Sequence, residues 1–169
     1  AVVSHFAYVF ASHDFTGWRS FIPFASGSVL NQTSVVWSLL GGLLMLWVCD
    51  SERLKTPVKV VCVLLLCAVT FPADWSCIAA LCILSIGSNR NAPKKQILWC
   101  LFYVSLYAVV YCLALDRVYG LLQLCVVLSI PLLARYNGRR GASPAINRVM
   151  KWLFYLYYPL HLFIIGLLQ

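Results

Sequence analysis

The sequence carries little charge and very few acidic residues. Charged residues account for 11% of the 169 residues, and Asp and Glu together number only five. A soluble domain has about 25% charged residues, whereas this chain is 62% hydrophobic and has a mean hydropathy of +0.86. The composition excludes an ordinary soluble domain and predicts an integral membrane protein with a single domain over residues 1–169.

Patterns typical of metal sites and of nucleic-acid binding are also missing. The eight cysteines contain no Cys-x-x-Cys pair and no Cys/His spacing of a metal site, so we expect neither a disulfide framework nor a bound metal. The net charge of +8 is spread over short segments between apolar stretches. It therefore indicates membrane topology and predicts no nucleic-acid partner.

Apolar segments separated by short polar stretches predict the fold. A helix needs about 20 apolar residues to cross a bilayer core of about 30 Å. Residues 1–12 are too few, so we interpret them as the second half of a helix that starts upstream. We expect an all-α, polytopic transmembrane bundle of about seven helices, the first one truncated at its N-terminus. The segments are 1–12, 34–49, 58–73, 75–86, 97–115, 118–134 and 149–169.

The basic residues decide whether residues 58–86 form one helix or two. A single helix would hold Pro72 and Asp74 at its centre. Two short helices place eleven of the 13 basic residues in the even-numbered loops, which the positive-inside rule assigns to the cytoplasm. We therefore expect two helices joined by a turn. The eleven residues are Arg53, Lys55, Lys59, Arg90, Lys94, Lys95, Arg135, Arg139, Arg140, Arg148 and Lys151.

The last of the apolar segments carries the most chemistry. Pro159 has no N–H to donate to the carbonyl of Tyr155, so an acceptor is freed shortly before His161. Tyr157 and Tyr158 precede His161 by four and three residues and share its face. An ionisable residue at membrane depth is a functional hypothesis. The alternative is an interfacial tyrosine belt with a histidine bonded to a neighbouring helix.

Two further residues complete a candidate catalytic set. His5 lies in the first segment at a depth similar to that of His161, so both imidazoles can line one cavity. A neutral imidazole there accepts a proton as a general base. Asp74 is the one acid far in sequence from a basic neighbour, and it can orient a histidine or a substrate amine. The alternatives are histidines that bond neighbouring helices and an aspartate that caps the next helix.

The loop before the last segment is a candidate phosphate site. Tyr136, Asn137, Arg139 and Arg140 lie in a turn with two glycines on the predicted cytoplasmic side. Guanidinium groups suit phosphate oxygens, which they bind with two parallel hydrogen bonds. The alternative is ordinary cytoplasmic charge that binds anionic lipid headgroups.

A non-catalytic function fits the same composition. Ser34, Ser38, Gly41 and Gly42 fall on one side of the second segment and predict close packing of a neighbouring helix. With the aromatic last segment, this surface suits a membrane subunit that scaffolds an assembly. The catalytic function requires that His5 and His161 face one interior cavity. In a scaffold subunit they can face separate lipid and helix surfaces.

Four stretches of the sequence resemble the TraX family of bacterial membrane proteins. They are TSVVWSLLGGLLMLW, PADW, PLLARYNGRRG and the closing FYLYYPLHLFIIGLL, in the family's order from Thr33 to Leu168. The Tyr-Pro-Leu-His part of the closing stretch is the most specific. The family includes a conjugal-transfer pilin acetylase and is similar to the acyltransferase-3 group of membrane acyltransferases.

The resemblance implies an acetyltransferase of the bacterial inner membrane. It implies acetyl-CoA as the donor, with its phosphates near Arg139 and Arg140, and an amine or hydroxyl of a pilin, peptide or glycan as the acceptor. His161 matches the family's closing motif, and His5 matches the histidine of its first helix. Ser4 stands where the family usually has an aspartate.

Overall fold

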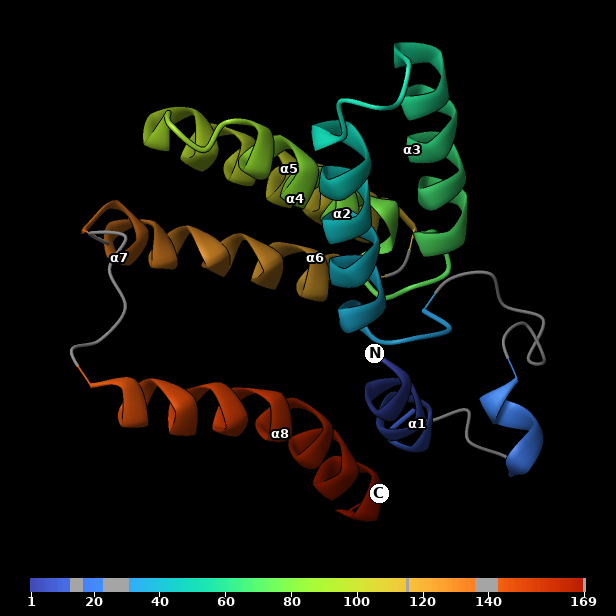
Figure 1. Ribbon diagram of the computed structural model, residues 1–169. Helices are drawn as coiled ribbons and strands as arrows, with labels where there is room; N and C mark the ends of the chain where they lie inside the picture. The colour runs from blue at the N-terminus through green and yellow to red at the C-terminus, as the bar shows by residue number, and fades with distance from the viewer. Residues whose placement is uncertain (13–16, 23–30, 115, 136–142, 169) are drawn as a thin grey trace.

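The computed structural model describes residues 1–12, 17–22, 31–114, 116–135 and 143–168 (Figure 1). The regular elements among these residues are helices, and one isolated bridge pairs Thr33 with Ala73. The predicted all-α class is therefore confirmed for the part of the chain described. The helices are α1 (Val2–Phe10), the 3₁₀ helix η1 (Trp18–Phe21), α2 (Val35–Asp50), α3 (Thr56–Thr70), α4 (Ser76–Ser88), α5 (Pro93–Ala114), α6 (Arg117–Gln123), the 3₁₀ helix η2 (Leu124–Ser129), α7 (Ile130–Arg135) and α8 (Pro144–Leu168).

The small residues of α2 pack it closely against α3 and α4. Ser38, Gly41 and Gly42 are buried on this side of the helix. A Cβ atom at Gly41 would come 2.2 Å from Cγ2 of Thr70, and one at Gly42 would come 3.0 Å from the carbonyl oxygen of Ala80. The predicted small-residue surface is thus confirmed as a packing surface, and it is used within the chain.

The turn between α3 and α4 is fixed to the segment that leads into α2. Residues 58–86 form two short helices, as the charge pattern predicts. Gln32 donates its N–H to the Pro72 carbonyl at 2.7 Å, and Asp74 donates its N–H to the Thr33 carbonyl at 2.8 Å. Trp75 adopts a φ of 64°, in the left-handed region that few residues other than glycine occupy. This backbone conformation starts α4 directly after the turn.

The predicted sixth helix is broken, which corrects the expectation of one helix over 118–134. A 3₁₀ stretch, η2, separates α6 from α7 beside α5 (Figure 1). Pro131 has no N–H to bond the Val127 carbonyl, and the N–H of Ile130 takes this carbonyl instead. The resulting bond spans three residues, so the chain winds as a 3₁₀ helix.

The closing helix α8 packs against α1. Phe10 and Phe163 stack with ring centroids 5.1 Å apart. A Cβ atom at Gly166 would come 2.9 Å from the Phe10 carbonyl oxygen, so the two backbones approach closely. The first half of α8 extends away from the other helices (Figure 1). The helix begins at Pro144 rather than at the predicted Val149.

Two described helices can cross a membrane by length and composition, α5 over Pro93–Leu113 and α8 over Pro144–Leu168. The remaining apolar helices have 10–17 residues, fewer than the about 20 that a bilayer requires. The predicted seven-span bundle is therefore not confirmed. The chain exposes 12244 Å² of surface, against about 8,400 Å² expected for a compact soluble protein of this mass. Much of this surface is apolar, as on α8, where no residue is buried.

Candidate functional site

The three predicted catalytic residues lie on three different elements. His5 is on α1, Asp74 is in the turn between α3 and α4, and His161 is on α8. The structure connects all three to Thr33–Val35, the residues that begin α2, which we call the α2 start. The connections are direct for His5 and Asp74, and they pass through one tyrosine for His161.

His5 uses both of its ring nitrogens. Nε2 lies 3.1 Å from the carbonyl oxygen of Phe21, and Nδ1 lies 2.9 Å from Oγ1 of Thr33. A carbonyl oxygen only accepts, so Nε2 carries the hydrogen, and Nδ1 of the neutral ring accepts from the Thr33 hydroxyl. The predicted alternative, a histidine bonded to neighbouring segments, therefore describes His5. In this arrangement His5 holds the α2 start and has no lone pair left for a substrate.

Thr33 links His5 to Asp74. Its side chain contacts His5, and its carbonyl accepts the Asp74 N–H at 2.8 Å. Oδ1 of Asp74 in turn accepts from the Trp75 N–H at 3.1 Å and from the Tyr107 hydroxyl at 3.3 Å. The Trp75 and Tyr107 rings stack with centroids 4.5 Å apart, which orders the phenol over the turn.

The Asp74 carboxyl is held in a partly buried site and has no basic partner among the described residues. Burial raises its pKa above the usual range, and the hydrogen bonds from Tyr107 and from the Trp75 N–H oppose that rise. The ion pair found among the described residues joins Arg90 and Asp50 instead. The alternative that Asp74 caps α4 is not met, because the N-cap position belongs to Trp75 and no side chain caps that helix.

His161 leaves one ring nitrogen available. Nδ1 lies 3.1 Å from the Tyr157 carbonyl oxygen and therefore donates to it. The neutral ring then carries its lone pair on Nε2, for which the described residues provide no hydrogen-bond partner. The acceptor of this bond is the carbonyl of Tyr157, one helical turn before His161. As predicted, the rings of Tyr157 and Tyr158 flank the imidazole, with centroids 5.1 and 5.3 Å away.

Tyr158 connects His161 to the α2 start. Its ring meets His161 edge to face, and its phenol lies close to the Val35 N–H and to the Ser34 hydroxyl, which has no hydrogen bond of standard geometry with the described residues. Ser34 is the N-cap residue of α2 and is fully buried, yet its hydroxyl caps no amide of the helix. His161 is thus one phenol ring away from a set of backbone and hydroxyl donors.

Several residues of this site are missing from the sequence-based set. Tyr8 shares a helix face with His5 and interacts electrostatically with Asp74 and Tyr158. The three-residue spacing between His5 and Tyr8 could have indicated the pair. Tyr107 gives no comparable signal, because its contact with Asp74 joins residues 33 positions apart. Thr33 is also unmarked, although it contacts both His5 and the turn.

The predicted phosphate site lies outside the described residues. Tyr136, Asn137, Arg139 and Arg140 all fall within residues 136–142. Their role toward a phosphate group stays a prediction.

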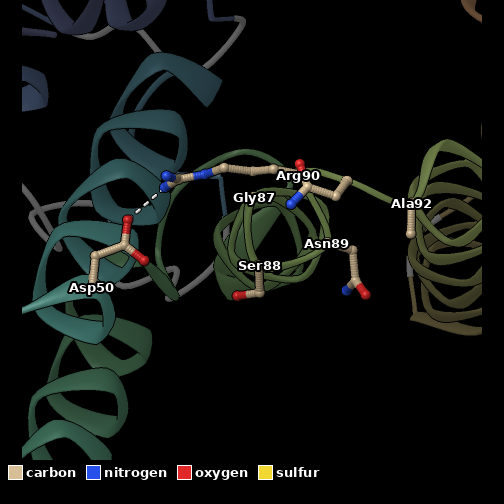
Figure 2. A pocket seen from close by; sticks show the side chains of 7 residues that line it. Asp50, Gly87, Ser88, Asn89, Arg90 and Ala92 are labelled. Atoms are coloured by element: carbon tan, nitrogen blue, oxygen red, sulfur yellow. Dashed lines mark hydrogen bonds and ion pairs between the residues drawn. The ribbon is translucent and has the colours of Figure 1, made fainter.

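A cavity of about 430 Å³ lies away from the histidines, where α2 and α4 end (Figure 2). Asp50 and Arg90 form an ion pair of 2.5 Å across its edge, with side chains 54% and 63% exposed. An exposed pair of this kind contributes little to stability. The α2 start and Asp74 lie at the opposite ends of these two helices, so this cavity is not part of the candidate site. Its lining residues are Asp50, Gly87, Ser88, Asn89, Arg90, Asn91 and Ala92.

Comparison with known proteins identifies the family. No curated protein and no solved structure matches the chain. The sequence model of the family described as TraX protein matches residues 1–169. This match covers the four stretches that carry the resemblance and also the first helix with His5. The chain therefore belongs to the TraX family.

Proposed function

We propose that this TraX protein is a membrane acetyltransferase that moves an acetyl group from acetyl-CoA to an amine or hydroxyl acceptor. The observation that carries the proposal is the Nε2 of His161, which has no hydrogen-bond partner among the described residues and lies one phenol ring from the donors of the α2 start. Family membership adds support, because the TraX resemblance implies acetylation of a pilin or of another envelope substrate in conjugation.

The proposed reaction is base-assisted attack on the thioester. Nε2 of His161 accepts a proton from the acceptor nitrogen or oxygen as that atom attacks the carbonyl carbon of the acetyl group. The carbon–sulfur bond breaks, and coenzyme A leaves as a thiolate. The imidazolium returns the proton to the sulfur, so His161 ends the cycle neutral. Such a base needs a lone pair that no neighbour occupies, which distinguishes His161 from His5.

We assign His5 and Asp74 to supporting roles. His5 positions Thr33 through a hydrogen bond of 2.9 Å. The Asp74 carboxylate, which accepts a hydrogen bond from the Tyr107 phenol, binds the ammonium form of an amine acceptor and takes the proton that this ammonium must lose before its nitrogen can attack. Aromatic rings favour a cation, and so does a carboxylate that has no basic partner among the described residues.

The donor is proposed to bind on the cytoplasmic side of the bacterial inner membrane, which the basic loops favour. The phosphates of acetyl-CoA would contact Arg139 and Arg140 in the turn that also holds Tyr136 and Asn137. The acetyl group would then travel toward the histidine, so transfer can run across the membrane.

Acetyl transfer by the purified protein in detergent tests the proposal. Radiolabelled acetyl-CoA is supplied with a peptide whose N-terminus is free and with the same peptide whose N-terminus is blocked. A glycan in a third reaction tests a hydroxyl acceptor. We expect label in the free peptide or in the glycan and none in the blocked peptide. Absence of transfer to every acceptor, with acetyl-CoA binding also absent, would contradict the proposed function.

The scaffold alternative loses its main support in the structure. Gly41 and Gly42, which would have formed the partner-binding surface, pack against Thr70 and Ala80 within the same chain. A substitution on that surface would therefore act on folding before it acted on any partner.

A further inference from the structure

Ser34 occupies an N-cap position without acting as a cap. A serine at this position normally accepts a hydrogen bond from the second or third amide of the helix. The Ser34 side chain makes no such bond, although it is 0% exposed. It also forms no hydrogen bond of standard geometry with the described residues. A buried hydroxyl without a partner is unfavourable, so its retention here needs an explanation other than helix stability.

The α2 start provides several donors for one negatively charged oxygen. The first amides of a helix have no partner within the helix, and the dipole of the 16-residue α2 places partial positive charge there. The segment is rigid, because the Trp37 N–H bonds the Ser34 carbonyl at 3.0 Å and Thr33 is bonded to the turn at Asp74. The donors are therefore fixed in place before any ligand arrives.

We infer that the Ser34 hydroxyl and the Val35 amide form the oxyanion-binding site of the transferase. The Tyr158 phenol lies close to both groups but forms no hydrogen bond of standard geometry with the Ser34 hydroxyl, and the thioester carbonyl oxygen would take its place. The inference rests on the proposed function, since it names the groups that stabilise that reaction's intermediate. Donors held at the position of the developing charge lower the barrier without reorganisation.

During acetyl transfer the carbonyl oxygen at this site gains a negative charge and then loses it. The acceptor atom forms a bond to the carbonyl carbon, and the π electrons of the carbonyl move onto its oxygen, where Ser34 and Val35 donate to it. His161 holds the proton that the acceptor has lost. When the oxyanion collapses, the double bond re-forms, the carbon–sulfur bond breaks, and the sulfur takes the proton from His161.

The substrate must replace the contact between Tyr158 and the α2 start, and this contact is weak. Among the described helices α8 packs mainly against α1, and none of its residues is buried. Tyr158 can therefore leave the α2 start without disrupting a core. His161 lies three residues further along the same helix face, within one turn of the group that is displaced.

Two buried serines of α2 provide a matched test in the purified protein. Ser34 and Ser38 are both 0% exposed, but Ser38 donates to the Ser76 carbonyl at 2.9 Å, whereas Ser34 has no such bond. We expect Ser34→Ala to lower kcat for acetyl transfer by about 10²–10³-fold with KM for acetyl-CoA unchanged, and to leave the melting temperature unchanged or raised. Ser38→Ala should lower the melting temperature and keep kcat.

The outcomes separate this inference from the proposed function. If the wild-type protein transfers acetyl groups and Ser34→Ala does so with the same kcat, the oxyanion assignment is overturned and the transferase proposal stands. If Ser34→Ala loses stability as Ser38→Ala does, the serine is structural and the assignment is overturned as well. If the wild-type protein transfers no acetyl group, both proposals fall together.

Discussion

The hydroxyl of Thr33 lies 2.9 Å from Nδ1 of His5. The same residue accepts the Asp74 N–H on its carbonyl, so one threonine joins the first helix to the turn between α3 and α4. Thr33 is buried, and the segment that contains it precedes α2 directly. The position of the α2 start, and with it the geometry of the candidate site, therefore depends on this residue.

Removing the Thr33 hydroxyl should destabilise the protein. Thr33→Val keeps the shape of the side chain but leaves Nδ1 of His5 without a donor, which should lower the free energy of unfolding by about 1–3 kcal/mol. Thr33→Ser retains the hydroxyl and is the control. Denaturant unfolding in detergent measures both variants. Equal stability of the two would show that the bond to His5 contributes nothing.

The Asp74 carboxyl should give the stability a dependence on pH. Its pKa is raised in the folded protein by burial, above the value of 3.8 for an exposed side chain. The folded state therefore binds the proton more tightly than the unfolded state does. The stability that this proton provides is complete below pH 3.8 and is lost as the pH rises through the folded pKa.

Asp74→Asn should remove this dependence. Melting temperatures measured from pH 3.8 upward should fall less steeply for the variant than for the wild type, so that the two curves separate as the pH increases. Parallel curves would contradict a raised pKa at this carboxyl.

Two glycines at helix contacts should respond differently to alanine. A Cβ at Gly41 would lie 2.2 Å from Cγ2 of the buried Thr70, whereas one at Gly87 would meet the Cδ atoms of Leu46 at 2.5 Å. The end of a leucine side chain can rotate away, but Thr70 is 1% exposed and has little room. Gly41→Ala should therefore cost about 1–3 kcal/mol by overpacking, and Gly87→Ala should cost less. The reverse order in thermal unfolding would show that α2 and α3 are packed less tightly.

Local sequence patterns predicted part of the fold and part of the site. The break near Pro72 followed from the charge of the loops, and the shared face of Tyr158 and His161 followed from helical spacing. Long-range contacts were beyond such patterns, because the pairing of Asp74 with Tyr107 depends on how separate helices pack. For the same reason the sequence could not distinguish His5 from His161. They differ in which ring nitrogens their surroundings occupy.

The number of membrane-spanning helices was the feature of the fold that the sequence predicted least well. Hydropathy places apolar segments in sequence, but helix length is set by backbone hydrogen bonds at each end. Pro131 interrupts one predicted helix, and Pro144 begins another before its apolar residues start. The number of membrane crossings therefore does not follow from the number of apolar segments.

Turnover of His161→Gln tests the central claim most directly. The measurement compares kcat for acetyl transfer from acetyl-CoA in the wild-type protein and in the variant, with thermal unfolding of both as the control for folding. Glutamine keeps much of the volume and hydrogen bonding of the imidazole but cannot act as a base. The account predicts that kcat falls by about 10²–10⁴-fold while the melting temperature is kept. A folded variant that turns over at the wild-type rate would contradict it.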